Sequence, residues 1–462
     1  MQPSSKDVFH AYDIRGLSPE ELDETFAERL GQAIVRQFAP RRVLVGRDMR
    51  LTSAGLEAAL IEAFVAAGVD VVSIGLCSTP LFNVTVGLSN GGVDMGVMVT
   101  ASHNPGKYNG FKLVRGDASP IGQGSGMEEL AETFFKDYVL AEPQKRGTVF
   151  EDKEALSRYV DHILKLAALP AAMPEIKIAV DAGNGMEGVV LPELLWRLPW
   201  LKVVPMYFEP DGTFPNHEAN PIKTETLNDL RTRVLSEKCD FGMAFDGDAD
   251  RVGFIDDSGS PVAGDVGTAL LAQEVLKNAP GGLVLYDVRS SWTVSEAIVE
   301  AGGRPKMCRV GHAFIKKQMR LEGAVFAGEI SMHYYFHSLR FVESGELALL
   351  YILRRLAREG VSLRDACRPL LRYAHSGEIN FEVGDKEAVL ARLRESYAPV
   401  ATKIIEIDGI RLEFKNAEDP KRDWWFNVRA SNTEPLLRLN VESRSEEFTR
   451  QKVAELSEII RL

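Results

Sequence analysis

The chain has 462 residues, which at about 150 residues per domain predicts about three domains or a few smaller ones. Its 54 basic and 66 acidic side chains leave a net charge of −12, and 45% of its residues are hydrophobic. This composition excludes a disordered chain, a collagen-like fibre and a disulfide-stapled miniprotein. The acidic balance argues against nucleic-acid or membrane partners, and it leaves room for an anionic small molecule in a locally basic cleft.

The cysteines are too dispersed to form a paired thiol site. They are Cys77, Cys239, Cys308 and Cys367, and no two form a Cys-x-x-Cys pair. This spacing argues against a thiolate zinc site or a redox dithiol, and it suits a reducing cytosol. The first residues lack the pattern of a signal peptide, and no apolar stretch approaches the roughly 18 residues of a membrane span. We therefore expect a cytoplasmic protein.

Three passages share one pattern: a short apolar run, a polar or Gly-rich loop, and an amphipathic helix. Strands are predicted over 42–48, 69–74, 176–181 and 282–287, and helices near 53–67, 191–198 and 293–301. Strands and helices that alternate over short loops predict parallel-type sheets covered on both faces. We expect three related mixed α/β domains over 1–150, 151–256 and 257–368.

The last part of the chain, 369–462, has a different pattern. Strands are predicted over 378–383, 404–407, 410–414, 424–428 and 436–441, and helices over 386–397 and 446–462. Asp408-Gly409 suits a tight hairpin turn between two of these strands. This segment is predicted to be a small α+β domain with an antiparallel sheet, and the four domains are expected to surround a central cleft.

The strongest local signal is an acidic loop, Asp246-Gly-Asp248-Ala-Asp250-Arg251, which follows the apolar run 241–245. Carboxylates at every second position of an extended segment face one side, where they repel unless a cation lies among them. Their hard oxygens favour magnesium, manganese or calcium. The spacing also resembles an EF-hand loop, but Arg251 stands where glycine is needed and the flanks read as strands. The alternative is a solvated acidic turn.

A second segment, Thr100-Ala-Ser102-His103-Asn104-Pro105, follows an apolar run. A serine exposed after a strand can act as a nucleophile when a metal or positive charge activates it, and Lys112 is close in sequence. The adjacent His103 is a poor triad base, and the Gly-x-Ser-x-Gly elbow of serine hydrolases is missing. The alternative is a turn whose polar side chains bond their own backbone.

Two further segments carry polar groups suited to a phosphosugar. Arg429-Ala-Ser431-Asn432-Thr433 combines a bidentate guanidinium with hydroxyl, amide and backbone donors, although it also fits an ordinary capped turn. Polar and apolar residues alternate in Gly328-Glu329-Ile-Ser331-Met-His333, so the three polar side chains can face one cleft. The alternative is that this segment is a half-buried strand edge. Each of the four expected domains thus contains one of the four segments.

In order and spacing, these four segments resemble the signature loops of the α-D-phosphohexomutases, and the resemblance runs from Ala11-Tyr-Asp-Ile-Arg-Gly16 into the last domain. It implies an isomerase of carbohydrate metabolism in which Ser102 is phosphorylated and donates to the sugar. A hexose 1,6-bisphosphate is then the intermediate and the activator. It also implies one Mg²⁺ per chain, held by Asp246, Asp248, Asp250 and a phosphoserine oxygen of Ser102.

The resemblance assigns further residues to the site. The group near the reacting phosphate, which stabilises charge or transfers protons, comprises Ser102, Arg251, Lys112, His103 and Arg15, and it leaves the general base unidentified. The substrate-binding group comprises Tyr12, Arg289, His312, Glu329, Ser331, His333, Arg429, Ser431, Asn432 and Thr433.

The loop that ends in His333 resembles phosphomannomutases and dual phosphomannomutase/phosphoglucomutases. Phosphoglucosamine mutases usually read Gly-Glu-Gln-Ser-Gly-His, and Ile330 and Met332 fit neither pattern fully. Arg289 stands where some dual-specificity members carry a sugar-contacting lysine, which leaves glucose phosphates open as substrates. We expect a phosphomannomutase, monomeric or weakly homo-oligomeric. The alternatives are a phosphoglucosamine mutase, a phosphosugar-binding protein without catalysis, and a metal-dependent phosphatase.

Overall fold

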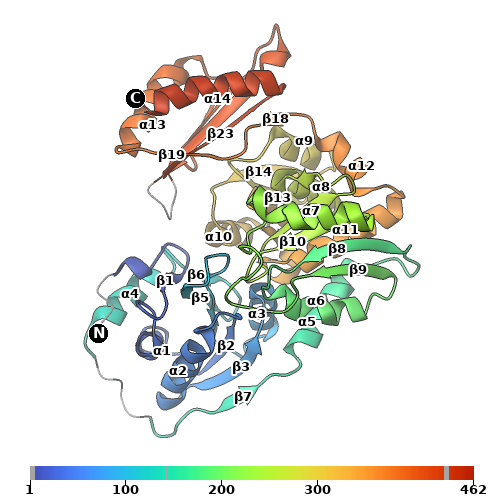
Figure 1. Ribbon diagram of the computed structural model, residues 1–462. Coiled ribbons are helices and arrows are strands. Elements are labelled where there is room, and N and C mark those ends of the chain that lie inside the picture. Colours follow the sequence, from blue (N-terminus) through green and yellow to red (C-terminus); the bar gives the residue numbers. More distant parts are fainter. Residues whose placement is uncertain (1–5, 139, 141–142, 431–435, 462) are drawn as a thin grey trace.

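The computed structural model describes residues 6–138, 140, 143–430 and 436–461, which form four β-sheets of seven, five, five and six strands (Figure 1). The first sheet contains β1 (Ile14–Leu17), β2 (Arg42–Arg47), β3 (Asp70–Leu76), β4 (Met95–Val99), β5 (Tyr108–Arg115), β6 (Pro120–Ile121) and β7 (Val149–Glu151). The second contains β8 (Ile176–Asp181), β9 (Leu201–Met206), β10 (Phe241–Phe245), β11 (Val252–Asp256) and β12 (Pro261–Val262). The third contains β13 (Leu283–Asp287), β14 (Arg304–Cys308), β15 (Phe326–Gly328), β16 (Tyr334–Phe336) and β17 (Val342–Glu343).

The fourth sheet contains β18 (Ala374–His375), β19 (Ile379–Glu382), β20 (Lys403–Ile405), β21 (Ile410–Phe414), β22 (Trp424–Ala430) and β23 (Leu436–Ser443). Helices associated with the first three sheets are α1 (Glu24–Phe38), α2 (Ser53–Ala66), α3 (Thr79–Leu88), α4 (Met127–Phe135), α5 (Ala155–Ala167), α6 (Glu187–Trp196), α7 (Asn228–Glu237), α8 (Gly264–Asn278), α9 (Trp292–Glu300), α10 (His312–Glu322), α11 (Gly345–Glu359) and α12 (Leu363–Cys367). Helices α13 (Lys386–Tyr397) and α14 (Glu446–Arg461) accompany the fourth.

The first three sheets repeat one topology. A central strand, β2, β8 or β13, lies between two parallel neighbours. The later of these neighbours, β4, β10 or β15, then pairs antiparallel with the next strand along the chain. The prediction of three related mixed α/β regions is therefore confirmed.

This repeat places three of the four sequence motifs at equivalent positions. The connection from β4 to β5 carries Ser102, that from β10 to β11 carries the three aspartates, and that from β15 to β16 carries Glu329 and His333. Each connection follows the carboxyl end of a strand that has a parallel neighbour, which is where open α/β sheets bind ligands. The shared topology thus presents each polar segment from the same part of its sheet.

The first sheet has apolar side chains on both faces. Val43 and Val45 of β2 pack with α1 and α2, whereas Leu44 joins a second core that contains Val84 of α3. Successive strand residues point to opposite faces, so a strand covered by helices on both sides is a continuous apolar run. Each such buried side chain contributes about 1.5–3 kcal/mol of transfer free energy.

The fourth sheet is antiparallel throughout its described strands, and Figure 1 shows α13 and α14 against it. Trp424 and Phe426 of β22 pack with Leu393 of α13 and Leu456 of α14. The predicted α+β fold is confirmed, and α13 has the predicted bounds. Among the described residues, no helix is both long and apolar enough to cross a membrane.

Candidate active site

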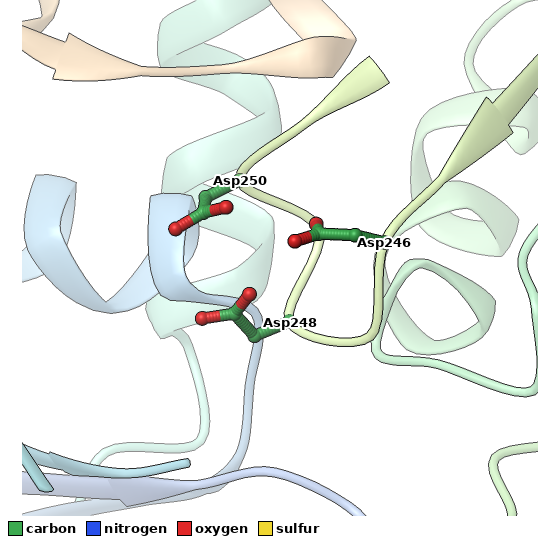
Figure 2. A group of neighbouring side chains, drawn as sticks. All are labelled: Asp246, Asp248 and Asp250. Atoms are coloured by element: carbon green, nitrogen blue, oxygen red, sulfur yellow. The ribbon is translucent and has the colours of Figure 1, made fainter. Parts of the chain in front are cut away.

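The three aspartates converge in the turn between β10 and β11. One carboxylate oxygen of each of Asp246, Asp248 and Asp250 lies within 4.8 Å of the others, and Figure 2 shows the carboxylates directed toward a shared space. The predicted convergence of the three carboxylates is found, but the predicted cause, alternation along an extended segment, is wrong. The backbone instead turns, with Ala249 N–H donating to the Asp246 carbonyl at 3.1 Å and Ala249 at φ +64°. The strand flanks agree with the rejection of an EF-hand.

Burial makes this cluster electrostatically demanding. Asp246 and Asp248 are fully buried and Asp250 is 5% exposed. Burial and the two neighbouring carboxylates raise the pKa of Asp246 well above its usual value. Burial would also raise the pKa of Asp250, but Lys112 and His333 outweigh it and hold that pKa well below its usual value. Asp248 Oδ1 accepts no hydrogen bond from any described residue, so the donor set fits a hard divalent cation such as Mg²⁺.

Two residues of the first sheet region contact the acidic turn. Lys112 of β5 donates from Nζ to Asp248 Oδ2 at 2.5 Å and to Asp250 Oδ2 at 2.7 Å. Burial would lower the pKa of Lys112, but these two carboxylates raise it above its ordinary value, so the side chain is an ammonium here. Thr79, at the start of α3, donates to Asp248 Oδ2 at 2.5 Å. The first two sheets thus share this site.

Ser102 lies beside the same carboxylates. Its Oγ donates to Asp246 Oδ2 at 3.2 Å and lies 3.2 Å from His103 Nδ1, although 144 positions separate Ser102 from Asp246. Burial, together with the positive charges of Arg251 and Arg15, lowers the pKa of His103 well below its ordinary value. His103 is therefore a neutral imidazole next to the hydroxyl. Arg15 donates to Asn104 Oδ1 at 2.9 Å, which places it at the same loop.

Glu329, Ser331 and His333 converge, but by a turn rather than by strand alternation. β15 ends at Gly328, and Met332 at φ +69° reverses the chain before β16. His333 Nδ1 then lies 3.1 Å from Glu329 Oε2 and 3.1 Å from Ser331 Oγ. The half-buried strand edge considered from the sequence is therefore not formed.

His333 also reaches the acidic turn. Its Nε2 lies 3.3 Å from Asp250 Oδ1 and 3.2 Å from Arg251 Nε. Burial would lower the pKa of His333, but Asp250 and then Glu329 raise it to about 9 despite the opposing charge of Arg251. Glu329 is held in turn by the hydroxyl of Tyr335 at 2.6 Å. These contacts connect the third sheet region to the first two.

Tyr12 and His312, both predicted to bind substrate, lie together. Their ring centroids are 5.2 Å apart, and a Cβ on Gly311 would come within 2.5 Å of the Tyr12 hydroxyl. Burial and then nearby lysines lower the pKa of His312 well below its ordinary value, so it is neutral. Gly311 N–H donates to Glu329 Oε1 at 3.1 Å, which ties this pair to the carboxylate of the β15–β16 turn.

The predicted phosphate-binding arginine lies in a cluster of basic side chains around one carboxylate. Glu378 accepts from Arg289 at 3.2 Å, from Arg429 at 3.4 Å and from Arg438 at 3.0 Å. Arg289 is also paired with Asp287 at 2.8 Å, so carboxylates surround it. The remaining predicted residues of the loop, Ser431, Asn432 and Thr433, lie outside the described residues.

Three residues that organise the site were not predicted from the sequence: Thr79, Glu378 and Arg50. The signal for Thr79 was weak, since Ser78-Thr79-Pro80 reads only as the start of a helix. Glu378 was placed on a strand without a role, because its three partners lie 51 to 89 positions away. Arg50 follows the first predicted strand in Arg47-Asp-Met-Arg50, and its partners are mainly backbone carbonyls, which no residue pattern reveals.

Comparison with known proteins places the whole chain in one family. Models for the phosphoglucomutase/phosphomannomutase α/β/α domains I, II and III match residues 6–139, 157–259 and 263–373, and the model for the C-terminal domain matches 378–459. The chain belongs to the phosphoglucomutase/phosphomannomutase family. It is therefore a phosphohexomutase by family, as the four motifs predicted.

Similar proteins agree with this family over nearly the full length. The phosphohexose mutases of Xanthomonas campestris pv. campestris are 40% identical over 98% of this chain and 99% of theirs. A phosphomannomutase of Methanocaldococcus jannaschii is 39% identical over 98% of this chain and 97% of its own. The crystal structure of a phosphoglucomutase/phosphomannomutase family protein from Burkholderia thailandensis superposes with a TM-score of 0.87 at 30% identity, covering 99% and 97% of the two chains.

Proposed function

We propose that this family member is a phosphomannomutase that interconverts mannose 1-phosphate and mannose 6-phosphate. The observation that carries the proposal is the position of Ser102 Oγ, 3.2 Å from Asp246 Oδ2 at a buried carboxylate cluster. A hydroxyl at such a cluster is suited to carry a phosphoryl group. The phosphomannomutase name of the relative from Methanocaldococcus jannaschii supports mannose as the sugar.

The chemistry is an exchange of phosphoryl groups between Ser102 and the sugar. The sugar hydroxyl attacks the phosphorus of phosphoserine, a new P–O bond forms to the sugar, and the bond to Ser102 Oγ breaks. The proton lost by the sugar oxygen ends on Ser102 Oγ, which becomes a hydroxyl again. The hexose 1,6-bisphosphate then reorients, and Ser102 takes up its other phosphate by the reverse step. A free hexose 1,6-bisphosphate accordingly primes the unphosphorylated protein.

Asp246, Asp248 and Asp250 would hold one Mg²⁺ together with a phosphoserine oxygen. When bound, that ion neutralises charge on the transferring group. Lys112 and Arg251 add positive charge at the same place, since Lys112 contacts two of the carboxylates and Arg251 Nε lies 3.7 Å from Asp246 Oδ2. Their role is electrostatic stabilisation of the transferring group.

The other residues hold the sugar. Burial would raise the pKa of Glu329, but His333 and Arg289 hold it below its ordinary value, and this carboxylate would accept hydrogen bonds from sugar hydroxyls. Arg429 and the loop at 431–433 would bind the phosphate that does not react. A site that grips both ends must accept the sugar in two orientations, and the bisphosphate reorients between them.

Arg289 bears on the sugar specificity. Arg289 is paired with Asp287 and Glu378 and lies 3.9 Å from Glu329 Oε1. We infer that it supports the Glu329 carboxylate and does not contact the sugar as the lysine of some dual-specificity members does. Glucose phosphates therefore remain a second substrate to be tested, with phosphoglucosamine mutase as the alternative activity. The intact serine and acidic motifs argue against a binding protein without catalysis.

Phosphorus NMR tests the proposal. Mannose 1-phosphate is incubated with the protein, Mg²⁺ and a trace of hexose 1,6-bisphosphate, with glucose 1-phosphate and glucosamine 1-phosphate in parallel samples. We expect the signal of mannose 6-phosphate to grow. Conversion of glucosamine phosphate alone would contradict the proposal in favour of the alternative mutase, and release of free phosphate alone would indicate a phosphatase.

A further inference from the structure

Arg50, between β2 and α2, uses all five of its guanidinium N–H groups. Nη2 donates to the carbonyls of Ser102 at 2.8 Å and Asn104 at 2.6 Å. Nη1 donates to the carbonyls of Pro105 and Tyr108, both at 2.9 Å. Nε donates to Asp48 Oδ2 at 3.1 Å. One side chain therefore collects four backbone acceptors from the seven residues 102–108 of the serine loop.

The guanidinium is itself held in place. Arg50 is 2% exposed, and Asp48, which anchors it, accepts a further hydrogen bond from Ser53 Oγ at 2.6 Å. The ring of Phe214, from the second sheet region, lies 5.3 Å from the Arg50 guanidinium carbon, a cation–π distance. A buried cation with its hydrogen bonds satisfied is a rigid support, because any displacement leaves donors or carbonyls unpaired.

This support bears directly on the conformation of Ser102. The residue has φ +50°, a left-handed conformation that is strained for a residue with a side chain. Its carbonyl faces Arg50 on one side and Gly247 on the other, where a Cβ on Gly247 would lie 2.5 Å from that oxygen. With the carbonyl fixed, Ser102 Oγ is directed to Asp246.

We propose that Arg50 is the positioning residue of the nucleophile: by binding the carbonyls of the serine loop, it holds Ser102 in the strained conformation that aims its Oγ at the carboxylate cluster. This role rests on the proposed function of Ser102 as phosphoryl carrier. The side-chain hydrogen bonds of Arg50 within the described part of the chain go to Asp48 and to the serine loop, so we expect it to act on phosphoryl transfer and to leave substrate binding unchanged.

The proposal distinguishes arginine from lysine. A lysine ammonium has three donors and no planar fork, so it cannot pair with Asp48 and with four carbonyls that lie in different directions. Arg50→Lys retains the buried positive charge and its ion pair with Asp48. It removes the planar set of donors that binds the four carbonyls. A misplacement of about 1 Å can cost about 100-fold in turnover, and this is the loss expected in kcat.

The experiment compares wild-type protein, Arg50→Lys and the matched control Arg47→Lys. Arg47 ends β2; its Nε is paired with Glu57 of α2 at 2.8 Å and its Nη1 donates to the Asp48 carbonyl at 3.4 Å. It makes no hydrogen bond to the serine loop 102–108 in the part of the chain that the structure describes. For each protein, kcat and KM are measured, and Ser102 phosphorylation by mannose 1,6-bisphosphate is timed by intact-protein mass spectrometry. Calorimetry measures the Kd of mannose 1-phosphate, and thermal unfolding checks the fold.

We expect Arg50→Lys to lose kcat and the rate of Ser102 phosphorylation by the same factor, with KM and Kd unchanged, and Arg47→Lys to match the wild type. A folded Arg50→Lys protein with normal kcat and phosphorylation, or with a loss confined to KM, overturns the proposal. If Arg50→Lys does not fold, Phe214→Leu decides. This change loosens the cover of the guanidinium, so a smaller loss in the same two rates supports the role and unchanged rates overturn it.

The two proposals fail differently. A wild-type protein that isomerises the sugar and is phosphorylated on Ser102, together with an Arg50→Lys protein indistinguishable from it, removes the role of Arg50 alone. A wild-type protein that is never phosphorylated on Ser102 removes the proposed function, and the role of Arg50 with it.

Discussion

His333 Nε2 lies 3.3 Å from Asp250 Oδ1, so an ion pair joins the turn of the third sheet that carries Glu329 to the acidic turn of the second. The opposite ring nitrogen contacts Glu329 at 3.1 Å. One imidazole therefore connects the carboxylate proposed for sugar hydroxyls to a carboxylate proposed for the metal. Binding of the sugar by Glu329 and binding of the metal by Asp250 are therefore expected to depend on each other.

Substitution of His333 tests that connection. His333→Asn shortens the side chain, so that Asp250 and Glu329 lose their common partner. Partners of metal ligands typically contribute about 10- to 100-fold to metal affinity or activity, and we expect a loss in this range. The measurement is the Mg²⁺ concentration for half-maximal activity, which should rise. An unchanged Mg²⁺ titration would separate the two turns functionally.

Removal of the Ser102 hydroxyl tests the phosphoryl carrier. Ser102→Ala should lower kcat by several orders of magnitude, because the exchange has no acceptor on the protein. The exposed Ser236 of α7 offers the matched control Ser236→Ala, which should retain wild-type kcat. Near-normal turnover by Ser102→Ala would contradict the exchange through this residue.

The acidic turn should set the metal requirement. Asp248→Asn replaces one buried carboxylate with an amide, a weaker ligand for a hard cation, so both activity and Mg²⁺ affinity should fall. Chelation with EDTA should abolish wild-type activity, and added Mg²⁺ should restore it. Asp257→Asn, at an exposed position beyond β11, is the control and should titrate like the wild type. Equal Mg²⁺ titrations for all three proteins would exclude Asp248 from the ligand set.

Arg429 should act on binding rather than on chemistry. Arg429→Ala removes a guanidinium proposed to hold the unreactive phosphate, so KM should rise about tenfold or more while priming of Ser102 by mannose 1,6-bisphosphate at saturation stays close to normal. The exposed Arg422 provides the control Arg422→Ala. A fall in kcat with KM unchanged would assign Arg429 to the chemical step instead.

His217 gives a pH-dependent contribution to stability. Burial would lower its pKa, but the hydrogen bond to Asp181 at 2.9 Å raises it to about 9 in the folded protein, against about 6.5 for an unperturbed histidine. Its contribution to the free energy of unfolding is therefore complete below about pH 6.5 and is lost as the pH rises through about 9. Chemical denaturation of wild type and His217→Gln should differ more at about pH 6 than at about pH 9.5. A constant difference would show that the charge of His217 contributes nothing.

Much of the fold was predictable because its signals are local. Apolar runs of strand length and the charged helix at Lys386–Tyr397 predicted elements that the structure contains within a few residues. The motif residues Ser102, Asp246 and Glu329 were identified because each lies in a short polar motif whose residue types suit phosphosugar chemistry. The turns that bring them together were not predictable. Ala249 and Met332 adopt left-handed conformations there, and alanine and methionine have no preference for that conformation.

The partners of the motif residues were harder to predict than the residues themselves. Lys112 of the first sheet contacts Asp248 and Asp250, which lie 136 and 138 positions later in the sequence. No local sequence pattern encodes contacts between residues so far apart in the chain. Arg50 binds carbonyls, which every residue type offers equally. The sequence therefore indicated the chemistry of the site, and the three-dimensional fold was needed to find what positions it.

Transfer of labelled phosphate tests the central claim most directly. The protein is phosphorylated with [³²P]hexose 1,6-bisphosphate, separated from the sugar, and mixed with mannose 1-phosphate and Mg²⁺ for a single turnover. We predict that label is found on Ser102 before mixing and passes to the sugar bisphosphate and then to mannose 6-phosphate after it, with no label bound by Ser102→Ala. Label that stays on the protein, or that appears only as inorganic phosphate, would contradict a phosphoserine that donates to the sugar.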